Sequence, residues 1–168
     1  IESENNLGET LRLKGDFKEA ERVYEGVARF AEEYNWPMHA AIAHLNLTFI
    51  NLTREDPSFA RIHLDQAEVH LQNHPKHWAW LVIGVIRACW AAESADENTC
   101  RAWWSVAIER GLGRIISVDL IAPLDRIVNA AERNGWNDIA SRAVSYREAI
   151  LHQPSSGAGD GDTDIRTS

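Results

Sequence analysis

The chain has 168 residues, of which 45% are hydrophobic and 25% are charged, and its net charge is −8. This length and balance are typical of one globular domain with a sizeable core. The acidic excess argues against a nucleic-acid partner, because nucleic-acid binders usually present a basic face. No apolar run approaches the roughly 18 residues of a transmembrane helix, so we expect no membrane partner.

The start of the sequence and its cysteines bear on the context of the chain. It opens with Ile1-Glu2-Ser3-Glu4, without Met or a signal-like segment, so we expect a piece of a longer protein with an upstream part. Its two cysteines, Cys89 and Cys100, form no CxxC pair. So few cysteines indicate a reducing compartment, and we expect a cytoplasmic protein.

Eight helices are predicted, because segments rich in Ala, Leu, Glu and Arg repeat apolar residues at helical spacing. Gly15-Asp16 ends the first helix and caps the second, and Pro37 follows the second. Asp56-Pro57 begins the fourth, and Pro75 closes it. Pro123 fits only the first turn of the seventh. The predicted helices span residues 2–14, 17–34, 38–52, 58–73, 77–92, 99–110, 120–134 and 137–152.

The composition changes near the C-terminus. From Pro154 onward the chain is small and polar, with Ser, Gly and Asp in place of apolar residues. Such a segment cannot offset the entropy lost on ordering. We therefore predict a helical domain over residues 1–153 and a disordered tail over 154–168.

The helices form pairs that share a pattern of small and bulky residues. The first pair has Leu7-Gly8, then Gly15, Ala20 and Tyr24. The third pair has Trp80-x2-Ile83-Gly84, and the fourth has Ala140-x3-Val144. This pattern resembles the tetratricopeptide repeat, W-x2-L-G-x2-Y followed by A-x3-F over about 34 residues. The resemblance implies an all-α fold, an α-solenoid of about four hairpins in a right-handed superhelix. Another antiparallel helical array or bundle is the alternative.

The stretch from Asn6 to Arg12 and the pair Asn46-Leu47 resemble the C-terminal arrays of large bacterial serine/threonine protein kinases and signalling ATPases. The chain holds no DFG or phosphate-binding glycine motif, so we expect no enzyme. The resemblance implies a non-catalytic scaffold in bacterial signalling that binds a protein or peptide. The alternatives are a regulatory array coupled to an upstream kinase or ATPase domain of the same polypeptide, and an unrecognised helical enzyme.

In the tetratricopeptide family the first helix of each pair lines the concave face. By resemblance, the peptide-binding groove of this chain is formed by Asn6, Glu9, Arg12, Asn46, Phe49, Trp78, Leu81, Val85 and Asn129. The alternative is that the apolar members are core residues, because the central helices of such an array are packed on two sides.

Tryptophan and histidine are unevenly distributed. Five of the seven tryptophans lie between Trp78 and Trp104. The adjacent Trp103 and Trp104 cannot face one core direction on a helix, so one of them lies at an interface or is exposed. The alternative is a Trp-rich core. His70, His74 and His77 have zinc-like spacing, but Pro75 breaks the helix, so we expect helix-end side chains and neither metal nor cofactor.

Overall fold

The computed structural model describes residues 1–111 and 117–152 of the chain. These two ranges contain eight α-helices and one short 3-10 helix, η1, at Val118–Leu120. The α-helices are α1 (Glu2–Leu13), α2 (Phe17–Glu33), α3 (Pro37–Thr53), α4 (Pro57–Leu71), α5 (Ala79–Glu93), α6 (Glu97–Gly111), α7 (Ile121–Asn134) and α8 (Asn137–Leu151).

The predicted all-α class is confirmed, and each helix ends within two residues of its predicted limits. Pro123 is the third residue of α7, in the first turn as expected. Asp56 caps α4 by accepting a hydrogen bond from the backbone N–H of Phe59. Asp16 precedes α2 as predicted, but its side chain makes no capping hydrogen bond. The predicted tail, 154–168, lies outside the described residues.

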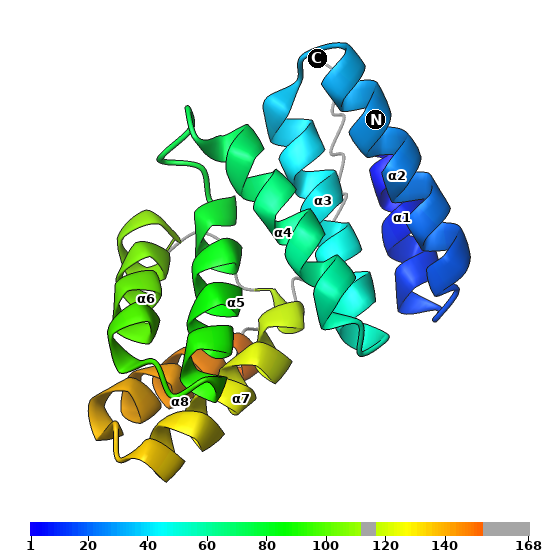
Figure 1. Ribbon diagram of the computed structural model, residues 1–168. Helices are drawn as coiled ribbons and strands as arrows, with labels where there is room; N and C mark the ends of the chain where they lie inside the picture. The colour runs from blue at the N-terminus through cyan, green and yellow to red at the C-terminus, as the bar shows by residue number, and fades with distance from the viewer. Residues whose placement is uncertain (112–116, 153–168) are drawn as a thin grey trace, which may run out of the picture.

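The helices pack as sequential hairpins (Figure 1). Neighbours in the sequence from α1 to α4 pack against one another, as do α5 with α6 and α7 with α8. The contact between α4 and α5 is much smaller, and α7 packs directly on α5. Figure 1 shows α1 to α4 side by side and the α7–α8 hairpin crossing the end of α5 and α6. None of the described helices is long and apolar enough to span a membrane.

Five of the turns between helices share one backbone conformation. In each, a residue after the helix has a positive φ between 55° and 82°. The N–H of the next residue donates to the carbonyl five positions back, as Asp16 does to Leu11 at 2.9 Å and Trp136 to Ala131 at 2.8 Å. This is the Schellman arrangement, which satisfies carbonyls at a helix end. The left-handed residues are Gly15, Asn35, Glu55, Ala95 and Gly135.

These left-handed residues recur at multiples of 20 positions, so a helix hairpin repeats every 40 residues. Five residues after each of them stands a small, buried side chain, at Ala20, Ala40, Ala60, Cys100 and Ala140. A small residue near the start of a helix lets the neighbouring helix approach closely. The α4–α5 connection, around Pro75, does not follow this pattern, and α4 and α5 pack much less closely than the two helices of a hairpin do.

Substitutions to and from glycine at the positive-φ positions should change stability through the backbone conformation alone, without any tertiary contact. Ala95 has φ 55°, where an L-residue is strained by about 1 kcal/mol, so Ala95→Gly is expected to raise the free energy of unfolding by up to about 1 kcal/mol. Gly135 has φ 74° and no neighbour within 4 Å of an added Cβ, so Gly135→Ala should lower the free energy by a similar amount. Urea unfolding measures both. Equal shifts of the same sign in the two variants would contradict the assignment.

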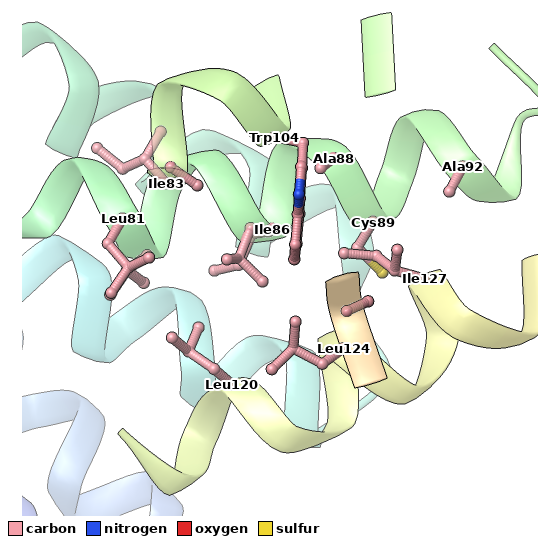
Figure 2. Close-up of a cluster of buried hydrophobic side chains, with 14 of the residues drawn as sticks. Leu81, Ile83, Ile86, Ala88, Cys89, Ala92, Trp104, Leu120, Leu124 and Ile127 are labelled. Atoms are coloured by element: carbon pink, nitrogen blue, oxygen red, sulfur yellow. The ribbon is translucent and has the colours of Figure 1, made fainter. Parts of the chain in front are cut away.

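The main core lies where α5 is enclosed by α6, α7 and η1. Most of α5 is buried, and its buried contacts with α7 are apolar. At the end of α5, Glu93 also forms an ion pair with Arg126 of α7. Figure 2 shows Leu120 and Leu124 facing Leu81 and Ile86 of α5, with Trp104 of α6 alongside. The two helices of a hairpin approach each other closely at Gly8 and at Gly84. A Cβ added at Gly8 would lie 2.6 Å from the ring of Tyr24, and one added at Gly84 would lie 2.8 Å from Ala107.

Candidate functional site

The residues predicted to form the groove fall into three groups. Phe49, Leu81 and Val85 are buried, with exposures of 9%, 1% and 0%, and belong to the main core. Trp78 packs against this core and is half-buried. These four apolar members therefore belong to one buried cluster or pack against it, and Leu81 and Val85 also line the pocket described below. As a binding groove the set stays a prediction.

The predicted polar members are exposed or half-buried. Asn6 and Asn129 are exposed, and Asn46 is half-buried. Glu9 and Arg12 are engaged within the molecule, as described next. The sequence pattern could not show that Arg12 pairs with Asp119, because the two residues are 107 positions apart.

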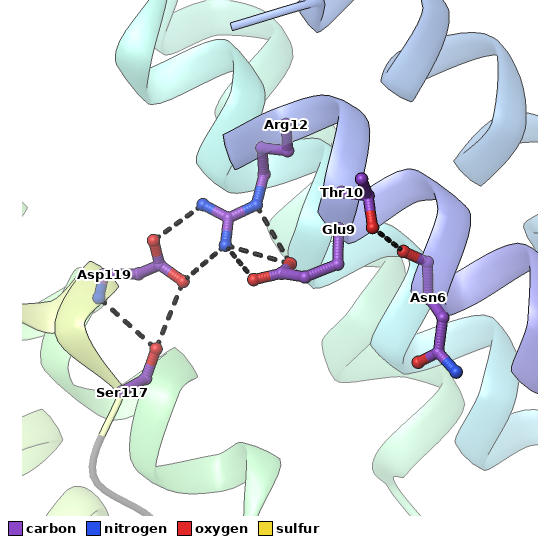
Figure 3. A network of polar contacts seen from close by, with 6 residues as sticks. All are labelled: Asn6, Glu9, Thr10, Arg12, Ser117 and Asp119. Atoms are coloured by element: carbon purple, nitrogen blue, oxygen red, sulfur yellow. Dashed lines mark hydrogen bonds and ion pairs between the residues drawn. The ribbon is translucent and has the colours of Figure 1, made fainter. Parts of the chain in front are cut away.

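Arg12 joins the first helix to η1 through a charged network (Figure 3). Its Nη1 and Nη2 donate to the two carboxylate oxygens of Asp119 at 2.7 Å and 3.0 Å, and Nη2 also donates to Glu9 Oε1 at 2.8 Å. Ser117 Oγ donates to the Asp119 carboxylate at 3.1 Å. The Arg12 side chain is only 10% exposed. Because Arg12 is already held by two carboxylates, it is not free to meet a ligand in this arrangement.

An apolar pocket of about 380 Å³ opens between α5, α6 and α8. Its floor includes Leu81 and Val85, two of the nine residues predicted for the groove. Its α8 side is more polar, with Ser141, Arg142 and Ser145 all exposed. The remaining lining residues are Trp104, Ala107, Ile108, Tyr146 and Ala149. An apolar floor with a polar rim is the usual composition of a site that binds an apolar side chain or ligand.

The two adjacent tryptophans of α6 face different surroundings, as predicted. Trp104 is 5% exposed, and its indole N–H has no hydrogen-bond partner among the described residues. Trp103 is half-buried beneath the Arg87 guanidinium, 5.6 Å from its ring centre. Arg87 also donates to Asp65 and Glu68 of α4. Trp103 thus lies at the α4–α5–α6 junction and helps to join two hairpins.

The cysteines offer no nucleophile. Burial raises the pKa of Cys89 to about 12 and that of Cys100 to about 11, so both remain thiols near neutral pH. Both are free and buried. Neither can act as the thiolate that cysteine catalysis requires.

A cluster of one glutamate and three histidines that the sequence did not indicate lies on α2, α3 and α4. Glu32 Oε1 is 3.0 Å from His44 Nε2 and 3.2 Å from His70 Nε2. His63 Nδ1 lies 3.2 Å from His44 Nδ1. Burial lowers the pKa of His44, against the opposing effect of Glu32, so that ring is neutral near neutral pH. The sequence spacing grouped His70 with His74 and His77. In the structure, His70 instead contacts Glu32 of α2 and His44 of α3.

No protein-family model matches the chain, and no match was found among curated proteins or solved structures. The structure itself therefore defines the class, an all-α chain of helices packed as sequential hairpins.

Proposed function

We propose that this chain is a non-catalytic scaffold of the tetratricopeptide type, which binds a peptide segment of a partner protein in bacterial signalling. In this proposal the helix hairpins form a solenoid, and the protein is cytoplasmic. The hairpins repeat every 40 residues, against about 34 in the typical tetratricopeptide repeat. The longer repeat fits helices of 15 to 17 residues in α2 to α6.

The observation that carries the proposal is the apolar pocket between α5, α6 and α8. Leu81 and Val85 provide an apolar floor, and the exposed serines of α8 provide hydrogen-bonding groups at the rim. A peptide can place one apolar side chain on such a floor and make polar contacts with the rim. The pocket volume of about 380 Å³ is of the size that binding pockets have.

The test begins with a displayed library of random peptides selected on the immobilised chain, followed by affinity measurements on the enriched peptides. Ala149 is exposed and lines the pocket, so Ala149→Trp would obstruct it without disturbing the core. We expect Ala149→Trp to weaken peptide binding at least tenfold, which corresponds to about 1.4 kcal/mol.

The matched control is Ser105→Trp. Ser105 is an exposed residue of the neighbouring α6 that does not line the pocket, so this variant adds the same bulky side chain elsewhere. It should bind the selected peptides as the original chain does. Failure to enrich any peptide, or equal binding by the two tryptophan variants, would refute the proposal.

A further inference from the structure

Three side chains of the kinds that bind transition metals converge from three consecutive helices. Glu32 is next to last in α2, His44 lies within α3, and His70 is next to last in α4. Their ligand atoms all lie within 4.8 Å of one another. We propose that Glu32, His44 and His70 form a binding site for a zinc ion.

The distances fit a tetrahedral ion. Two ligand atoms at about 2.0–2.1 Å from zinc, separated by a tetrahedral angle, lie about 3.3 Å apart. The Glu32 carboxylate oxygen lies 3.0 Å from one histidine nitrogen and 3.2 Å from the other. The third pair, His44 and His70, has nearly parallel rings with an interplanar angle of 10°, so these rings must rotate for both Nε2 atoms to face one ion.

The ligand set selects the kind of ion. Two imidazole nitrogens and one carboxylate oxygen suit zinc and its neighbours in the transition series, whereas magnesium and calcium prefer oxygen ligands alone. Three protein ligands leave one tetrahedral position for water. The Glu32 and His70 side chains are 43% and 20% exposed, so an ion and a water molecule can reach the site from solvent.

His63 is placed to orient His44, the most buried of the three proposed ligands. When His44 binds an ion through Nε2, its remaining proton lies on Nδ1. The His63 Nδ1 atom, 3.2 Å away, can accept a hydrogen bond from it. Metal-binding histidines commonly donate their other ring N–H in this way, and the partner fixes the orientation of the ring. His63 is therefore expected to position His44 without touching the ion.

The same three groups also form a hydrogen-bonded cluster, in which both rings donate to the Glu32 carboxylate. Binding of an ion replaces these two N–H donors by two nitrogen ligands, and the single proton of each ring, bound as a neutral imidazole, moves from Nε2 to Nδ1. The hydrogen-bonded cluster and the ion site are thus two states of one arrangement, and zinc titration distinguishes between them.

The experiment uses the untagged chain, treated with a chelator, dialysed and titrated with zinc chloride in a calorimeter. We expect one zinc ion to bind per chain and the thermal midpoint to rise, because the ion joins α2, α3 and α4. Magnesium and calcium at the same concentration should produce neither effect. Absence of one-to-one zinc binding would overturn the proposal.

Two pairs of variants locate the ion. Glu32→Gln and His70→Ala are expected to weaken zinc binding more than about tenfold, since even residues outside the ligand set contribute about 10–100-fold. Their controls are Glu33→Gln, the adjacent exposed carboxylate, and His74→Ala, a histidine four positions after His70 and beyond the end of α4. Both controls should bind as the original chain does. Zinc binding that is lost in His74→Ala but kept in Glu32→Gln would place the ion at the end of α4 and overturn the proposed site.

Discussion

We expect Gly84→Ala to lower the free energy of unfolding by about 2–3 kcal/mol, measured by urea denaturation. A Cβ at this position would lie 2.8 Å from the Ala107 Cβ and 2.8 Å from the Ala107 backbone nitrogen. A backbone atom inside a helix cannot rotate away as the end of a side chain can, so α5 and α6 must separate. Because α5 is also packed on α7, the separation would disturb the main core.

Gly26→Ala is the matched control. It makes the same substitution within a helix, but no atom lies within 4 Å of the added Cβ. There the higher helix propensity of alanine should raise the free energy of unfolding by up to about 1 kcal/mol. Ala107→Gly, combined with Gly84→Ala, should restore only part of the loss, since the backbone contact remains. A Gly84→Ala variant as stable as Gly26→Ala would contradict the close packing of α5 on α6.

Truncation of the two adjacent tryptophans should have very different effects. Trp104→Ala removes a large side chain that is 5% exposed, which costs about 3–5 kcal/mol when a core aromatic is deleted. Trp103 is half-buried beneath Arg87, so Trp103→Ala should cost about 1 kcal/mol. Both free energies can be obtained from urea denaturation followed by circular dichroism, which does not depend on the tryptophan that is removed.

The difference between these two variants tests which face of α6 meets α5. Circular dichroism spectra before unfolding should show that both variants keep their helices. If Trp103→Ala proved the more destabilising of the two, α6 would be rotated about its axis relative to the packing described here.

The helices were predictable because their ends are specified locally. Gly15, Pro37 and the Asp56-Pro57 pair mark ends that need no knowledge of the rest of the chain. The left-handed turns at Glu55 and Ala95 were not predicted, because these residues carry no signal for a positive φ. They became apparent only through the regular spacing of the turns in the structure.

The pocket and the histidine cluster were less predictable than the helices, because both depend on which sides of each helix are covered by neighbouring helices. Leu81 and Val85 look alike in the sequence whether they line a groove, a pocket or a core, and their surroundings are set by α6 and α8. The cluster of Glu32, His44 and His70 joins residues up to 38 positions apart on three helices. No local spacing could have predicted it.

We expect a peptide to bind over the pocket between α5, α6 and α8. The most direct test is a methyl NMR titration of the chain with a peptide selected from the library. The signals of Leu81, Val85 and Ala149 are expected to shift on binding. Shifts confined to residues around Asn6, Asn46 and Asn129, with the pocket methyl signals unchanged, would contradict it.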